Sequence, residues 1–106
     1  MGHLVIACYR PKPGKSRDLL ECIHDHMPVL KQQGLITERE PVVMKARDGS
    51  IAEIFEWKSE DAVEAAHSNS EVLKLWERFS KCCEYITPAD ITECHQPFSP
   101  FEPIEV

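Results

Sequence analysis

Glu53, Trp57 and His67 could carry out chemistry at one junction of the sequence, where an apolar segment runs into a helix. Glu53 shares one face of a predicted strand with Phe55 and Trp57. If that face is covered, its carboxyl group needs a hydrogen-bond partner or must take its protonated, neutral form. Glu53 could equally be a surface charge near a hairpin. Trp57 could be a platform for the ring of a substrate, or a side chain of the core or of a dimer contact.

Three histidines are candidates for a general base, because histidine most often has this role in enzymes. His67 falls at a break between two predicted helices. It could face the mouth of a pocket, or it could cap the preceding helix. His24 and His26 lie in an earlier helix beside Pro28, and a proline in a helix is the kind of local irregularity that often marks a site.

The cysteines do not indicate a metal site. Cys22 and His26 are four residues apart, which is the spacing of two metal ligands on one helical face. Two ligands do not make a site, however, and no C-x-x-C or H-x-x-x-H pair accompanies them. The pair Cys82-Cys83 is better explained by small core residues than by redox chemistry. Five cysteines without a C-x-x-C pair are typical of reduced thiols in the cytoplasm.

Composition excludes several classes of protein. The chain of 106 residues has a net charge of −6, with Lys and Arg scattered along it, so we expect no binding to nucleic acid or to an anionic membrane. The N-terminal apolar run is short and lacks a charged start, which favours a first strand over a signal peptide. No stretch is long enough to span a bilayer. We therefore expect a single cytoplasmic domain.

The elements that must position these side chains follow from the spacing of apolar residues and from turn signals. Apolar residues at three- and four-residue spacing predict a helix before Gly34, and Pro28 should kink or interrupt it. Asp48-Gly49 is the strongest hairpin signal. The predicted elements are a strand over 3–10, a helix over 15–33, strands over 36–47 and 51–57, a short helix capped by Ser59, a helix that starts at the capping box Ser68-Asn69-Ser70-Glu71, and a strand over 86–94.

This order of elements predicts an α+β fold of the ferredoxin-like βαββαβ type, with a four-stranded antiparallel sheet. Right-handed connections place the first and third strands at the centre. Pro41 in the second strand and Pro88 at the start of the fourth agree with this order, since proline is tolerated on edge strands. The domain is expected over residues 1–95. The Pro-rich tail over 96–106 is expected to lack regular structure and to lie as a strap along the dimer.

Both faces of the predicted sheet are apolar. Leu4, Ile6 and Cys8 lie on one face of the first strand, and the alternate residues on the other face are also largely apolar. Helices can cover only one face in this topology, and an uncovered apolar face is an interaction surface. A second copy of the chain is its simplest cover, so we expect a homodimer.

One part of the sequence resembles a known family. Phe55-Glu56-Trp57-Lys58-Ser59, followed by Ala62, Ala66-His67-Ser68 and Val72 to Trp76, resembles the dimeric α+β-barrel proteins related to antibiotic-biosynthesis monooxygenases. In that family two ferredoxin-like chains pack sheet against sheet into a barrel, and each subunit has a pocket between sheet and helices. The order of elements over residues 3–95 is similar. The resemblance implies a homodimer that takes a small apolar or aromatic ligand.

The resemblance also implies a reaction. The best-studied chemistry of the family is the oxidation of phenolic or polyketide rings by O2 without metal or flavin, so no cofactor is expected. A branch that degrades haem depends on an Asn in the first strand, which this chain lacks. The implied function is cofactor-independent oxidation of a small aromatic or quinol substrate. The implied catalytic residues are His67 and His24, and the implied substrate-binding residues are Trp57, Tyr9, Glu53 and His26.

A function of another class is the alternative. The chain could be a non-catalytic or stress-related dimeric protein that binds a small apolar molecule, because a fold does not determine a function. On that hypothesis the histidines are structural.

Overall fold

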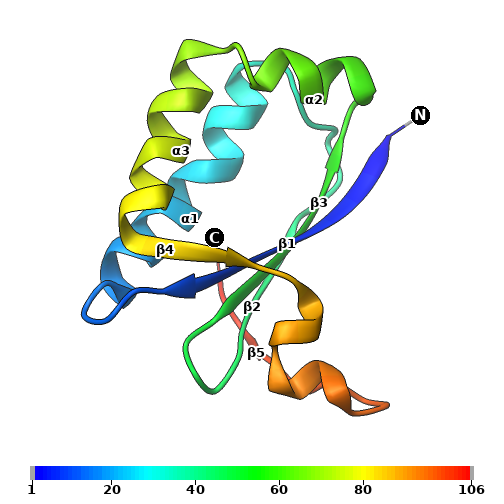
Figure 1. Cartoon of the computed structure of the whole chain (residues 1–106). Helices are drawn as coiled ribbons and strands as arrows, with labels where there is room; N and C mark the ends of the chain where they lie inside the picture. The colour runs from blue at the N-terminus through cyan, green and yellow to red at the C-terminus, as the bar shows by residue number, and fades with distance from the viewer. Residues whose placement is uncertain (1, 106) are drawn as a thin grey trace.

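The computed structural model describes residues 2–105, and it has one antiparallel sheet with helices packed on one of its faces (Figure 1). The five strands lie in the order β4-β1-β3-β2-β5. The elements are β1 (His3–Pro11), α1 (Ser16–Gln32), β2 (Val42–Lys45), β3 (Ile51–Trp57), α2 (Glu60–Ala66), α3 (Ser70–Cys82), β4 (Cys83–Ile86), the 3-10 turns η1 (Pro88–Asp90) and η2 (Thr92–His95), and β5 (Glu102–Pro103).

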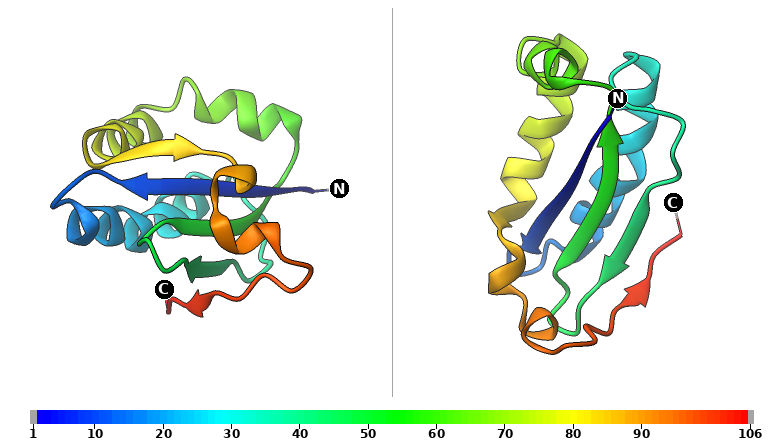
Figure 2. Two further views of the ribbon diagram at one scale, coloured as in Figure 1. Left: turned by 60° about the horizontal axis from the view of Figure 1, so that its bottom comes forward. Right: turned by 90° about the vertical axis from the view of Figure 1, so that its right-hand side faces the viewer.

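The long strands β1 and β3 are interior strands, as predicted. They pair from His3 opposite Trp57 to Tyr9 opposite Ile51. The predicted four-stranded sheet is wrong, because the tail supplies a fifth strand. The short strand β5 pairs with the last residues of β2 and makes this part of the tail regular (Figure 2).

The chain after α3 differs from the predicted strand over 86–94. Strand β4 begins directly after α3 and ends at Ile86. Pro88 therefore lies in the 3-10 turn η1 and not at the start of a strand. A proline fits the first position of such a turn because its missing N–H would have no partner there. Pro41 lies immediately before β2 and not within it.

Helix α1 runs through Pro28 as one element, so Pro28 does not interrupt it, and the kink that was the other expected outcome stays a prediction. Proline at this position removes the hydrogen bond to the carbonyl group of His24. His24 and Pro28 are both exposed, so water can bond to that carbonyl group. Gly34 follows the helix with φ of 71°, a left-handed conformation that favours glycine, and it ends the helix as predicted.

The predicted N-cap of α2 is confirmed, and the predicted N-cap of α3 is wrong. Ser59 caps α2, because its hydroxyl accepts a hydrogen bond from the N–H of Ala62 at 3.1 Å. The N-cap of α3 is Asn69 and not Ser68. The amide oxygen of Asn69 accepts bonds from the N–H groups of Glu71 at 3.0 Å and Val72 at 3.1 Å.

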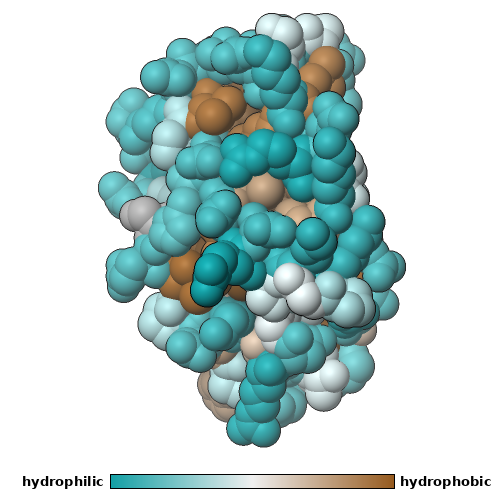
Figure 3. Space-filling view, turned by 90° about the vertical axis from the view of Figure 1, so that its left-hand side faces the viewer, coloured by the Kyte–Doolittle hydropathy of each residue, from teal (hydrophilic) through white to brown (hydrophobic). Residues whose placement is uncertain are grey.

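The main core lies between the sheet and the helices. One cluster joins Tyr9 and Ile51 of the sheet to Leu19 and Phe79 of the helices, and a second joins Phe55 and Trp57 to residues of α1, α2 and α3. The outer side of α3 and α1 is mostly hydrophilic (Figure 3). None of the helices within residues 2–105 has the length and apolar character that a membrane span needs.

The second face of the sheet is covered only in part by the chain itself. Cys8 and Ala52 pack there against Ile91 and Phe101, which come from the segment after β4. The rest of this face is open, and we call it the open sheet patch. Three of its apolar side chains are more than half exposed and the fourth is half-buried; they are Leu4 (59%), Ile6 (57%), Val42 (51%) and Ile54.

The N-cap of α3 gives a test of the fold. Asn69→Ala should lower the free energy of unfolding by about 1 kcal/mol, because two helix N–H groups lose their acceptor. Ser68→Ala is the matched control and should change it by less than about 0.5 kcal/mol. Urea denaturation of both variants checks this, and a larger loss for Ser68→Ala would place the cap at Ser68.

Candidate functional site

A cavity of about 460 Å3 opens on the helical face of the sheet, in the size range of small-molecule sites. Its walls come from β1, β3 and β4 and from α1 and α3, with the end of α2 at one side. No Lys, Arg, Asp or Glu side chain from residues 2–105 lines it. Aromatic rings make up much of the wall, namely Tyr9, Phe55, Trp57, Trp76, Phe79 and Tyr85.

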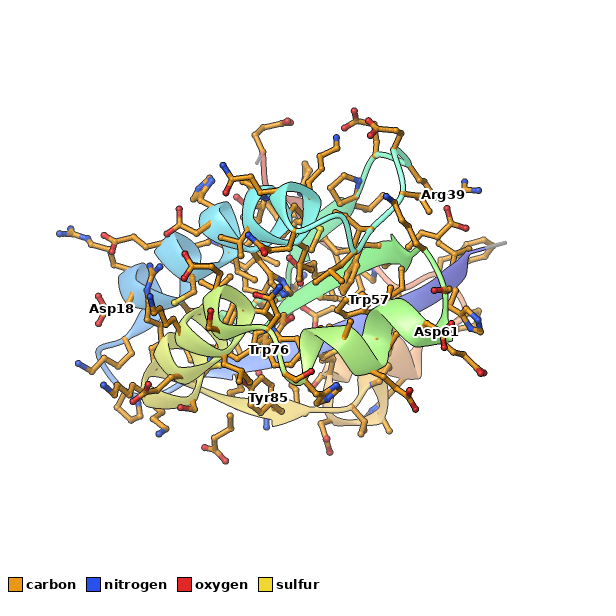
Figure 4. The ribbon with its side chains drawn as sticks, turned by 90° about the horizontal axis from the view of Figure 1, so that it is seen from above. Asp18, Arg39, Trp57, Asp61, Trp76 and Tyr85 are labelled. Carbon is orange, nitrogen blue, oxygen red and sulfur yellow. The ribbon has the colours of Figure 1, made fainter. Side chains whose placement is uncertain are left out.

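The labelled side chains show how the cavity is assembled. Trp57 comes from β3, Trp76 from α3 and Tyr85 from β4. In Figure 4 Trp57 and Trp76 lie toward the middle of the molecule, and Tyr85 lies between α3 and β4. Asp18 and Asp61 lie at the edge of the molecule and point outward. Such a wall of apolar rings suits a flat, apolar ligand.

Behind this wall lies a fully buried carboxylate. Glu53 has no exposed surface. The hydroxyl of Tyr9 donates a hydrogen bond to Glu53 Oε1 at 2.8 Å, and His26 Nδ1 lies 2.8 Å from the same oxygen. Glu53 Oε2 has no hydrogen-bond partner among the described residues. The alternative that Glu53 is a surface charge is wrong, and the first of the two expectations for a buried Glu53, a hydrogen-bond partner, is met by Tyr9 and His26.

The register of the sheet and the phase of α1 bring these groups together. Tyr9 is the diagonal neighbour of Glu53, because Ala7 is the residue directly opposite Glu53 on β1. His26 lies on the buried stripe of α1, three residues after Ile23 and four before Leu30. The carboxylate therefore ties the centre of the sheet to the first helix.

Trp76 fixes the protonation state of His26. The indole Nε1–H of Trp76 donates to His26 Nε2 at 3.3 Å. Since indole can only donate, Nε2 is the unprotonated nitrogen, and the ring proton lies on Nδ1 and points to Glu53. His26 is therefore a neutral imidazole. Two neutral donors therefore meet at Glu53 Oε1, and hydrogen bonds to a carboxylate favour its ionised form.

The surroundings hold this network in place. The ring of Phe79 packs 5.0 Å from Tyr9 and 5.0 Å from His26, and Phe55 lies 5.6 Å from His26, all measured between centroids. Burial, followed by the negative charge of Glu53, raises the pKa of Tyr9 far above its ordinary value. Tyr9 thus remains a hydrogen-bond donor throughout the neutral pH range.

The position of His67 agrees with both of the roles considered from the sequence, a cap of the preceding helix and a side chain at the mouth of the pocket. It follows α2 directly, and its Nδ1 lies 2.8 Å from the carbonyl oxygen of Val63, which requires a proton on Nδ1. Its exposed ring also lines the cavity and packs 5.2 Å from the ring of Trp76. In neutral His67 the nitrogen left to accept a proton is Nε2.

The structure brings five of the six predicted site residues together. Tyr9, His26, Trp57 and His67 line the cavity, and Glu53 lies directly behind His26. His24 does not belong to this group, because its side chain is exposed on α1 and lines no part of the cavity.

Trp76, Phe79 and Tyr85 were missed as site residues. Trp76 and Phe79 recur at the helical spacing of a core stripe, which gives no sign that one of them donates to His26. Tyr85 is an exposed residue of β4, which begins at Cys83, whereas the predicted strand began only at residue 86. No sequence pattern therefore singled it out.

Cys22 and His26 do not form a metal pair. The thiol of Cys22 lies 3.9 Å from that of Cys82, while His26 is bonded to Glu53 and Trp76. Within residues 2–105 no group of three or more His, Cys, Asp or Glu side chains is placed to hold a metal ion.

Comparison of the chain with protein-family models gave no match, and comparisons with curated proteins and with solved structures gave none either. The geometry of the site is therefore the basis for inferring a function.

The two tyrosines of the cavity test the buried network. Tyr9→Phe should lower the free energy of unfolding by about 1.5–3 kcal/mol, because the Glu53 carboxylate loses one of its two donors. Tyr85→Phe is the matched control, since Tyr85 is exposed and its hydroxyl makes, within residues 2–105, just one long bond of 3.4 Å to the carbonyl oxygen of Trp76. Chemical denaturation that finds equal losses in the two variants would contradict the network.

Proposed function

We propose that the cavity binds a small aromatic compound with a hydroxyl group and that His26 accepts the proton of that hydroxyl. The observation that carries this proposal is the Glu53–His26 pair, with its 2.8 Å bond, at an apolar aromatic cavity. A carboxylate bonded to Nδ1 orients an imidazole and stabilises its protonated form, which makes Nε2 the better base. Trp57 and Tyr85 would contact the faces and edge of the ring, and His67 would lie at the exposed rim.

The reaction that fits this base is oxidation of the ionised ring by O2. Removal of the proton leaves an electron-rich phenolate, which can give electrons to O2 directly. One oxygen atom then enters the ring as a quinone carbonyl and the other leaves as water, so that no further reductant is needed. A water-poor cavity favours such chemistry, because it protects reactive intermediates. The proposal agrees with the resemblance to antibiotic-biosynthesis monooxygenases.

One observation favours the second candidate, a protein that binds a small molecule without transforming it. The indole N–H of Trp76 occupies Nε2 of His26, which is the atom that a base would use. The two candidate functions therefore differ in whether a ligand can replace the indole N–H of Trp76 as the hydrogen-bond partner of His26 Nε2. The present bond between these two groups, at 3.3 Å, is at the weak end for an N–H donor.

Oxygen uptake with a panel of phenols and quinols tests the catalytic proposal. His26→Ala should reduce the rate by about 10²–10⁴-fold, the usual contribution of a general base. His95→Ala is the control, because His95 is exposed and, within residues 2–105, its ring bonds to the carbonyl group of Ala89 alone. Binding of the same compounds with no oxygen uptake would support the non-catalytic candidate instead.

We also infer that two copies of a ferredoxin-like domain pair through the open sheet patch. The strand order β4-β1-β3-β2, with all three helices packed on one face, supports a ferredoxin-like core to which β5 is added. Ile6, Ile54 and Val42 lie opposite one another across three strands and form a contiguous apolar row. Ile6 and Val42 stay more than half exposed in the described part of the chain, and a second copy would cover them.

The assembly is tested by native mass spectrometry of two matched variants. Ile6→Lys places a charge in the open sheet patch and should convert a dimer into a monomer. Leu73→Lys, at an exposed apolar position on α3, should leave the dimer intact. A wild-type monomer, or equal effects of the two changes, would contradict this assembly.

A further inference from the structure

The charge of the site limits which ligands can enter it. Glu53 is buried, and two neutral donors, Tyr9 and His26, meet at one of its oxygens, which favours the ionised form of the carboxylate. No Lys or Arg side chain from residues 2–105 lines the cavity. One negative charge is thus buried there without a positive partner, and a second one would be strongly disfavoured.

We propose that the cavity accepts ligands as neutral, weakly acidic hydroxyl compounds, excludes those that enter as anions, and stores the ligand's proton on Glu53. This inference rests on the proposed function, because it assigns the destination of the proton that His26 removes. It also extends it, since carboxylates and other ionised compounds of the same size are excluded as ligands.

The proton moves in two coupled steps that balance. The ligand O–H gives its proton to His26 Nε2, while the proton on His26 Nδ1 passes to Glu53 Oε1 over the 2.8 Å bond. His26 ends neutral with its proton on Nε2, Glu53 ends as a carboxylic acid, and the ligand ends as an anion. The total charge is the same before and after, so the negative charge moves from Glu53 to the ligand.

Each hydrogen bond of the network has a counterpart after the transfer. The new Glu53 O–H can donate back to Nδ1, which has become an acceptor, and Tyr9 still donates to Oε1. The indole N–H of Trp76, released from Nε2, becomes a donor for the new ligand anion, as does the new Nε2–H of His26. The unpartnered Oε2 of Glu53 fits this account, because an ionised carboxylate with one oxygen unpaired gains from neutralisation.

The experiment uses the wild-type protein and 4-nitrophenol, whose phenolate is yellow, at a pH where the free compound is mostly neutral. Absorbance reports whether the bound compound is ionised, and calorimetry in two buffers of different ionisation enthalpy counts the protons released. The expected result is a bound phenolate with no proton released to the buffer. A bound phenolate with one proton released would overturn the inference and leave the proposed base in place.

The second arm compares ligands. 4-Nitrobenzoate is an anion of similar shape and should bind at least about tenfold more weakly than 4-nitrophenol, as expected for like charges on either side of an imidazole ring at an effective dielectric constant of about 20. Equal binding of the two compounds would overturn the inference. So would a failure of 4-nitrophenol to bind, or its binding as the un-ionised phenol, and these two outcomes would also count against the proposed function.

The variant Glu53→Gln removes the proton acceptor. It should bind 4-nitrophenol without the yellow shift and should lose most of the discrimination against 4-nitrobenzoate, whereas Glu84→Gln, an exposed carboxylate on β4, should behave as the wild type. Retention of the yellow shift in Glu53→Gln would contradict the inference. The two wild-type arms decide the question even if Glu53→Gln does not fold, and oxygen uptake remains a separate measurement of the reaction.

Discussion

The carboxylate of Glu53, buried at the centre of β3, is the constraint on which the rest of the structure depends. A buried charge requires donors, and both come from other elements, Tyr9 from β1 and His26 from α1. His26 in turn takes the indole N–H of Trp76 on α3. One acid thus fixes how the sheet and two helices meet. The cavity lies at this meeting point, so the group that costs stability is also the group that can do chemistry.

The fold could be predicted where the signal is local. Gly34, Asp48-Gly49 and Ser59 each act through their own backbone conformation or side chain, and each ends or starts an element as predicted. The tail could not be predicted in this way. The pairing of Glu102–Pro103 with β2 depends on contacts between residues far apart in the sequence, which local propensity does not contain.

The site could be predicted only in part, for a related reason. Alternation along β3 places Glu53 on the same face as Phe55 and Trp57, but its partners lie on other elements. The choice between His24 and His26 depends on helical phase. His26 falls on the stripe of Leu19, Ile23 and Leu30, so this part of the sequence contained the answer.

The tautomer of His26 tests the account most directly, because the charge of the site and the direction of proton transfer both depend on it. Long-range proton–nitrogen correlation NMR of the histidine side chains at neutral pH measures the protonation of each ring nitrogen. The structure requires His26 to be neutral, with its proton on Nδ1 and a bare Nε2. A ring with its proton on Nε2, or a doubly protonated ring, would contradict the account, since Trp76 could then not donate to Nε2.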